Sequence, residues 1–174
     1  APVDEVGHGQ QIGLGVVVNQ TGWQQVLETN KQNYFSDFVT RSRFTTAYSP
    51  ALTAQQFVDR LYTNAGMAPA SGANRAAAIS EFSSTTPADA AARARALRLV
   101  AEDPMLSQQE FNKAFVLMQY FGYLRRNPDD PPDSDFAGYN FWLTKLNQFN
   151  GNYVNAEMVK AFLASSEYRQ RFGQ

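Results

Sequence analysis

The spacing of apolar residues changes character near Thr21. Residues 1–20 contain four glycines and the β-branched run 16–18 but no helical periodicity, which predicts an irregular, glycine-rich N-terminal lead-in. Beyond Thr21, apolar residues recur at intervals of three and four. The clearest runs are Trp23, Val26, Leu27, Tyr34 and Phe38; Phe57, Leu61, Tyr62 and Ala65; and Phe111, Phe115, Met118 and Gly122. We therefore predict an all-α helical bundle, with helix over more than half of the chain and little or no sheet.

Capping residues mark the predicted helix starts, because a side chain that accepts from the first N–H groups stabilises a helix N-terminus. The pattern is fullest at 52–57, where Thr53 is the predicted N-cap, Gln56 closes a capping box and Leu52 staples to Phe57. Other predicted starts are Ser107 with Glu110, Asn155 with the pair Val154 and Val159, Thr21 with Gln24, Thr86 and Pro87 with Asp89, and one of Asp133, Ser134 or Asp135. Breaks are predicted at 49–50, 66–69, 128–132 and 150–152.

Landmarks recur along the chain at similar offsets. Thr53 and Ser107 lie 54 residues apart, and the segment 38–48 aligns without gaps to 162–172. Three further residues, Phe57, Tyr62 and Pro69, recur 58 to 59 positions later as Phe115, Tyr120 and Pro128. Such periods indicate duplicated helical units of about 60 residues. We predict a lead-in with the end of a partial repeat over 1–52, a divergent repeat over 53–110 and a C-terminal repeat over 107–174, all packed as one domain.

The C-terminal repeat has motifs of a known family. Arg126 is followed by Pro128 and Asp129, then come Gly138 and Trp142, and the last segment, 162–168, closes on Ser-Ser-Glu-Tyr. This pattern resembles the bacterial domain-of-unknown-function 4214 family and also looks like the phycobilisome linker domain. The resemblance is clearest over 111–173 and faint over 53–110. The chain departs from the pattern in having eight residues between Asp129 and Gly138.

The resemblance implies a fold and a setting but no chemistry. Members of the family are typically parts of long exported or surface proteins, sometimes beside calcium-binding β-sandwich modules, and no catalytic residues are established for them. By resemblance, we also expect the arginine at position 126 to bond to the backbone around Pro128.

Composition narrows the possible functions. The net charge of −1, with 15 basic and 16 acidic residues, argues against nucleic acid and anionic membranes as partners. The longest apolar stretch, 115–124, is far shorter than the roughly 20 residues that a membrane span needs. Abundant asparagine and glutamine with only four lysines favour an extracellular or cell-surface location. Because the sequence opens without methionine, we expect a mature or excised piece of a longer protein.

An acidic loop is the one candidate for a metal site. Calcium prefers clustered oxygen ligands, which Asp129, Asp130, Asp133 and Asp135 offer. Pro131 and Pro132 stiffen this loop, however, and it lacks the ligand pattern of an EF-hand. We therefore expect a solvated loop whose last acids cap the next helix, with no metal or other cofactor bound.

Aromatic and amide side chains alternate over residues 139–153, as they do on sugar-binding surfaces. The candidate ligand surface is Tyr139, Asn140, Phe149, Asn150, Asn152 and Tyr153. The competing interpretation is a core face, since Tyr139, Trp142, Leu143 and Leu146 follow helical spacing. We expect Trp142 to be buried, which leaves Phe149 and Tyr153 as the surface aromatics.

No catalytic arrangement is apparent. Gly7, Gly9, Gly13 and Gly15 do not match a phosphate loop, and His8, the sole histidine, has no serine or cysteine motif to serve. Arg93 and Arg95 are expected on a solvated helix face, although together with Arg98, Arg125 and Arg126 they offer contacts for an acidic partner.

These observations favour a non-enzymatic helical interaction or spacer module of a larger secreted or cell-surface bacterial protein. Its partners would be neighbouring domains or another protein. The first alternative is a carbohydrate-binding module that uses residues 139–153, and a second is a hydrolase whose site the sequence does not reveal.

Overall fold

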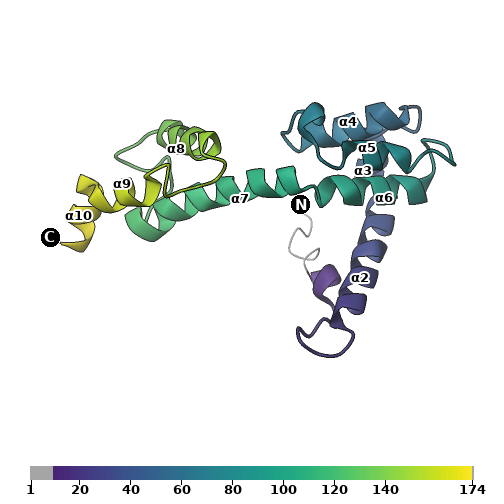
Figure 1. Cartoon of the computed structure of the whole chain (residues 1–174), viewed down its shortest axis with the longest axis horizontal. Coiled ribbons are helices and arrows are strands. Elements are labelled where there is room, and N and C mark those ends of the chain that lie inside the picture. Colours follow the sequence, from purple (N-terminus) through teal and green to yellow (C-terminus); the bar gives the residue numbers. More distant parts are fainter. Residues whose placement is uncertain (1–9, 174) are drawn as a thin grey trace. The chain divides into compact units, whose positions relative to one another are not determined.

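The computed structural model describes residues 10–173, most of which are helical and none of which lies in a strand (Figure 1). The all-α prediction is therefore confirmed. The chain divides into two compact units, Ala1–Leu106 (unit 1) and Ser107–Gln174 (unit 2). The bounds of unit 2 match those of the predicted C-terminal repeat, whereas duplication itself stays a prediction. Gly7, His8 and Gly9 lie outside the described residues.

The described part of unit 1 begins with a lead-in, which consists of one helical turn at 10–13 and a series of turns up to Gly22. Its elements are α2 (Trp23–Phe38), α3 (Ser42–Ala47), α4 (Ala54–Asn64), the 3-10 turn η1 (Pro69–Ser71), α5 (Arg75–Ser80) and α6 (Ala90–Ala101). Helix α6 contacts α2, α4 and α5. In Figure 1, α4, α5 and α6 lie together and α2 extends away from them. The described part of the lead-in is thus partly helical rather than wholly irregular.

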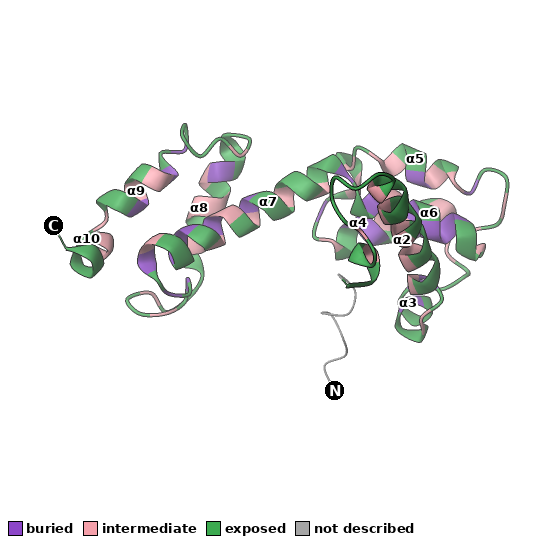
Figure 2. Ribbon diagram, turned by 90° about the horizontal axis from the view of Figure 1, so that it is seen from below, coloured by how far each residue is buried: buried purple, intermediate pink, exposed green. Residues whose placement is uncertain are grey.

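The core of unit 1 lies between α4 and α6. Phe57, Val58 and Tyr62 on α4 are fully buried, and α6 buries alanines on more than one side (Figure 2). Alanine suits a helix with several neighbours, because its small side chain lets them approach closely and it has the highest helix propensity. Aromatic rings close the remaining space, with the Phe57 ring edge-on to Phe44 and Phe82.

Unit 2 consists of most of α7 (Pro104–Gln119), the π-helical turn η2 (Tyr120–Leu124), α8 (Ala137–Gln148), α9 (Met158–Ala164) and α10 (Ser166–Phe172). Its core is smaller than that of unit 1. The buried apolar residues are Val116, Tyr120, Leu124, Leu146, Ala156, Met158 and Phe162. Val116 and Tyr120 on the α7–η2 segment, Leu146 on α8 and Phe162 on α9 bring the helices of unit 2 together.

The predicted capping box at the start of α4 is confirmed. The Thr53 hydroxyl accepts from the backbone N–H of Gln56 at 3.2 Å, and the Gln56 side chain accepts from the N–H of Thr53 at 3.0 Å. The prediction for Ser107 is wrong, because α7 begins three residues earlier at Pro104. The Asp103 carboxylate accepts from the N–H of Met105 at 2.8 Å, and proline suits the first turn that follows.

Three other predicted helix starts differ from those in the structure. Helix α2 begins at Trp23 after Gly22, whose left-handed backbone replaces the predicted Thr21 cap. Asp89, predicted to close a box, is itself the cap of α6. Helix α9 begins at Met158 rather than after Asn155, because the Asn152 side chain accepts from the N–H groups of Val154 and Asn155 and holds a turn there.

Candidate functional site

The six residues of the predicted ligand surface do not all remain available to a ligand. The Tyr139 hydroxyl donates to the Lys113 carbonyl at 3.1 Å, and the Asn152 side chain is used in the turn before α9. Asn140, Phe149, Asn150 and Tyr153 are exposed. Phe149 and Tyr153 are therefore surface aromatics, as predicted.

Trp142 is half-buried, so the prediction of a buried side chain holds only in part. Its ring lies 5.6 Å from the Phe162 ring and packs against the core of unit 2, while the Lys145 ammonium lies 5.3 Å from its centre. Leu146 on the same stripe is fully buried. The stripe is a core face, and Trp142 occupies its edge.

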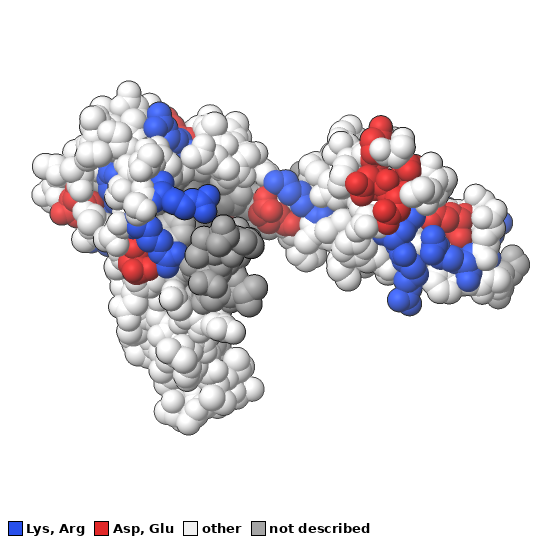
Figure 3. All heavy atoms as spheres, turned by 180° about the vertical axis from the view of Figure 1, so that it is seen from behind, with Lys and Arg blue, Asp and Glu red and all other residues white. Residues whose placement is uncertain are grey.

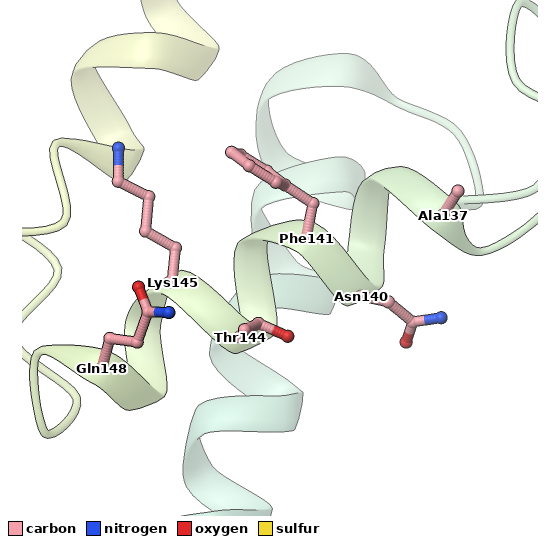
Figure 4. Close-up of a pocket in the computed structure, with 6 residues that line it drawn as sticks. All are labelled: Ala137, Asn140, Phe141, Thr144, Lys145 and Gln148. Carbon is pink, nitrogen blue, oxygen red and sulfur yellow. The ribbon is translucent and has the colours of Figure 1, made fainter.

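The outer surface of α8 carries a pocket of about 610 Å³ lined by Ala137, Asn140, Phe141, Thr144, Lys145 and Gln148. Phe141 is largely exposed, and Asn140 and Gln148 supply amides, which is the composition expected of a sugar site. Figure 4 shows, however, that the Phe141 ring and the Asn140 amide point to different sides of α8. One sugar ring would therefore not stack on Phe141 and bond to Asn140 at once.

A stack of three aromatic rings joins α7 to the loop before α9. The Phe111 and Phe115 rings lie 6.1 Å apart and the Phe115 and Tyr153 rings 5.1 Å apart, both nearly parallel. Phe115 stacks on both of the other rings, which reduces the ring face that it leaves open to solvent. Sugars bind to open ring faces, whereas side chains of a protein partner can pack on edges as well.

A chain of amides lies beside this stack. Gln108 donates to the Asn112 side chain, which is buried and donates to Asn147 on α8, each at 2.8 Å. Gly151 approaches so closely that an added Cβ would lie 2.8 Å from the Gln108 amide nitrogen. These contacts fix α7, α8 and the following loop to one another, and they use both polar atoms of the Asn112 side chain.

The outward face of the α7–η2 segment is apolar, and we call four of its residues the α7 stripe: Phe111, Ala114, Met118 and Phe121. Their spacing of three, four and three places them on one helical face, and all four are exposed, Phe111 by 60%, Met118 by 59% and Phe121 by 40%. Val116 and Tyr120 occupy the opposite, buried face. Ser107 and Gly122, also exposed, continue the stripe at its ends without adding a charge.

The acidic loop between η2 and α8 forms a visible patch of carboxylates (Figure 3), but its acids serve separate partners. Asp130 accepts from the backbone and side chain of Asn127, Asp133 pairs with Arg126, and Asp135 accepts from the N–H of Ala137 at the start of α8. Within residues 10–173, no group of three or more acids, histidines or cysteines is placed to hold a metal ion. The N-cap position of α8 is Phe136, whose side chain makes no cap bond, so the expected capping role of Asp135 holds only in that it accepts from the first N–H of the helix.

Arg126 is the polar centre of unit 2. As expected from the resemblance, it bonds to the backbone around Pro128, donating to the carbonyls of Asn127, Pro128 and Asp130 at 3.0 to 3.3 Å. It also forms a bidentate ion pair with Glu167 on α10, at 2.7 and 3.0 Å, and donates to the Asp133 carboxylate at 2.7 Å. The hydrogen bonds to Glu167 raise the pKa of the guanidinium above its usual value. Sequence reasoning missed both acidic partners.

Arg93 contradicts the prediction of a solvated face, since it is only 5% exposed. Its guanidinium donates to the carbonyls of Pro87, Tyr48 and Ser49 at 2.7 to 2.8 Å and lies over the Phe57 ring. Burial lowers its pKa. Arg95 is exposed as predicted, and pairs with Glu81.

A carboxylate and a phenol meet in the interior of unit 1. The Tyr62 hydroxyl donates to Asp103 at 2.7 Å, and the same carboxylate accepts from the N–H groups of Asn74 and Met105 at 2.8 Å. Burial and the neighbouring carboxylate raise the pKa of Tyr62. Burial would also raise the pKa of Asp103, but its hydrogen bonds outweigh burial and lower it. Both groups are buried and fully bonded, so the pair is structural.

Within the part of the chain that the structure describes, no helix combines the length and the apolar character needed to cross a membrane. No family model, no curated protein and no solved structure matches the chain.

Proposed function

We propose that the chain is a non-enzymatic helical interaction and spacer module, in which unit 2 binds a protein partner through the α7 stripe. The observation that carries this proposal is the exposure of Phe111, Met118 and Phe121 on one uncharged helical face. Large apolar side chains gathered on one exposed face favour association, because burying them removes apolar surface from water.

The distribution of exposed apolar side chains supports unit 2 as the binding unit. Among the described residues, ten large exposed hydrophobic side chains lie in unit 2 and five in unit 1, although unit 2 is the shorter. Four of the five in unit 1 lie between Leu14 and Val26, in or near the lead-in. Among its described residues after Val26, unit 1 exposes one large hydrophobic side chain, Met105, which leaves little apolar surface there for a partner.

Ion pairs between distant segments support the spacer role of unit 1. Arg98 on α6 pairs with Glu28 on α2 and with Glu102, and Lys31 on α2 also pairs with Glu102. This network ties α2 to α6 along the face where the two helices meet. Each exposed pair adds little stability alone, about 0 to 1 kcal/mol, but together they restrict the direction in which α2 extends.

The proposal also includes the location of the protein outside the cell. We place the module in a larger secreted or cell-surface bacterial protein, as implied by the resemblance of unit 2 to the 4214 family and by a surface rich in asparagine and glutamine and poor in lysine. Its partners would then be neighbouring domains or other proteins outside the cell.

A second candidate is carbohydrate binding, for which the α8 pocket supplies the Phe141 ring and the amides of Asn140 and Gln148. A panel of oligosaccharides tests it directly. Binding by calorimetry that Phe141→Ala abolishes would support this candidate, and we expect no binding because the ring and the Asn140 amide point to different sides of the helix.

The main test separates binding from folding. Phe111→Ser combined with Met118→Ser should leave the urea midpoint nearly unchanged, because substitutions at exposed positions usually alter stability by about 0.5 kcal/mol or less. The same variant should lose most of its binding of the apolar dye bis-ANS to the native protein. Fluorescence titration measures this loss.

Val17→Ser combined with Val18→Ser is the matched control, since both valines are exposed but lie in unit 1. The control should retain dye binding at the stripe. If the stripe variant binds the dye as wild type does, the stripe is not an accessible binding surface and the proposed function fails.

A further inference from the structure

We propose that the α7 stripe docks on the same stripe of a second copy of this chain, with the two helices antiparallel. The inference rests on the proposed function and names the partner of that surface. A two-fold symmetric pair uses one patch twice, so the patch must complement itself in both charge and shape.

The charges at the ends of the stripe meet the first requirement. Glu110 precedes Phe111 at one end, and Arg125 follows η2 at the other, both exposed. In an antiparallel pair each Glu110 lies near Arg125 of the second copy, whereas a parallel pair would place like charges together. Glu110 also bonds to Lys113 at 2.7 Å, and Arg125 lies over the Phe172 ring, but both contacts are at the surface and can rearrange.

The side chains of the stripe meet the second requirement. A register that sets Glu110 opposite Arg125 is centred between positions 117 and 118, and the same register sets Ala114 opposite Phe121 of the second copy. The small alanine leaves room for the ring, so large and small side chains interdigitate on both sides of the axis. Met118 then lies next to the axis and meets its own counterpart.

The exposed area sets the expected strength. Taking about 200 Å² as the full area of one such side chain, the stripe offers roughly 300 Å² per copy. The pair would bury about 600 Å² from these side chains, which is below the roughly 1,200 Å² of a standard interface. We therefore expect a weak, reversible dimer with a dissociation constant on the order of 0.1 to 1 mM.

Sedimentation equilibrium of the full chain, from about 10 µM to 1 mM, tests the charge pairing at the concentrations that a weak dimer requires. Glu110→Arg alone and Arg125→Glu alone should each weaken association about three- to ten-fold, because each sets like charges together at both ends. The double variant Glu110→Arg with Arg125→Glu should restore association. Both positions are exposed, so the melting temperature of the diluted protein should stay unchanged and serves as the folding control.

Engineered cysteines test the register, since the chain has no cysteine of its own. Met118→Cys should form a disulfide dimer with itself under mild oxidation, and an equal mixture of Ala114→Cys and Phe121→Cys chains should form mainly the mixed dimer. Cysteine at Lys160, on the exposed surface of α9, is the control and should cross-link no faster than chance collision.

The outcomes separate this inference from the proposed function. The inference that a second copy is the partner is wrong if the protein stays monomeric to about 1 mM. It is also wrong if neither Glu110→Arg nor Arg125→Glu changes the association constant. If Phe111→Ser with Met118→Ser still abolishes dye binding in that case, the stripe remains a binding surface for another protein. If dye binding is also unaffected, both proposals fail.

Discussion

Units 1 and 2 each bury a guanidinium, that of Arg93 in unit 1 and that of Arg126 in unit 2, but unit 1 also buries a carboxylate. Unit 1 has a buried carboxylate, Asp103, surrounded by N–H and O–H donors from three segments. Unit 2 has a buried guanidinium, Arg126, surrounded by carbonyls and two carboxylates. Each centre joins segments far apart in the sequence, Tyr62 to Asp103 in one and Arg126 to Glu167 in the other. In both units, buried charges whose partners come from distant segments therefore help to fix how those segments pack.

The two units differ more strongly in how many apolar side chains they leave exposed to solvent. Unit 1 buries a large cluster of aromatic and alanine side chains, while unit 2 has fewer buried apolar residues and more exposed ones. The number of exposed apolar residues does not follow from chain length, since the shorter unit exposes more of them. The comparison teaches that unit 1 encloses most of its apolar residues, whereas unit 2 buries one apolar face of α7 and leaves a second one exposed.

The largest effect is expected from Arg126→Met. The substitution leaves Glu167 and the carbonyls of the loop without their donor, and breaking a buried ion pair from one side typically costs about 3 to 5 kcal/mol. The two tryptophans report separately, Trp142 in unit 2 and Trp23 in unit 1. In urea, the midpoint followed by Trp142 in a Trp23→Phe background should fall sharply.

Arg125→Met is the matched control, because this neighbouring arginine is exposed. It should move the midpoint of unit 2 by about 0.5 kcal/mol or less. An equal loss in both variants would mean that charge in general, and not the bonds of Arg126, stabilises unit 2.

A smaller loss, about 2 kcal/mol, is expected in unit 1 from Asp103→Asn. One oxygen becomes an NH₂ group that faces an N–H donor, either of Asn74 or of Met105, and a buried donor left without an acceptor costs about 1 to 3 kcal/mol. Trp23 fluorescence in a Trp142→Phe background measures it. Asp129→Asn, an exposed acid in unit 2, should leave the Trp23 midpoint unchanged, and a fall there would count against the local explanation.

Local signals in the sequence predicted some of these features well. The Thr53 capping box involves residues three apart, so the sequence contains all of its information. The Ser107 start failed because a stronger pair, Asp103 followed by Pro104, begins the helix first. Arg93 was misplaced because its acceptors, at Tyr48 and Ser49, are more than 40 residues away.

The α7 stripe shows a different limit. The run Phe111, Phe115, Met118 and Gly122 has the periodicity of a core face, yet Phe111, Met118 and Gly122 are exposed and Val116 and Tyr120 are buried. The helix is apolar on two faces, and spacing alone does not reveal which face meets the core. The signal that was present is the number of apolar residues, since a helix with two apolar faces has more of them than a single core face needs.

Lowering the pH should weaken unit 1 by less than Asp103→Asn does, because protonation removes the charge but keeps both oxygens. Hydrogen bonds to Arg75 lower the pKa of Asp59, and those described above outweigh burial and lower the pKa of Asp103. A lowered folded pKa means that the stabilisation is complete above the ordinary value of about 4 and is lost as the pH falls through the folded value. The Trp23 urea midpoint should therefore decline below about pH 4. Asp103→Asn should flatten this decline, and a decline of unchanged slope would exclude Asp103 as a contributor.

The smallest effect, a null one, is expected from adding calcium. An ion at the acidic loop would need oxygens from Asp130, Asp133 and Asp135 together, but each already accepts from a different group. Binding would have to draw Asp133 away from Arg126, and the bonds lost there would offset much of the gain from the metal. Calcium stabilises the folded chain only through preferential binding to it, so millimolar calcium should leave the melting temperature of unit 2 where magnesium leaves it. A saturable rise in melting temperature with calcium alone, abolished by Asp135→Ala, would contradict this expectation. It would mean that the polar centre around Arg126 depends on a metal ion, unlike the centre around Asp103 in unit 1.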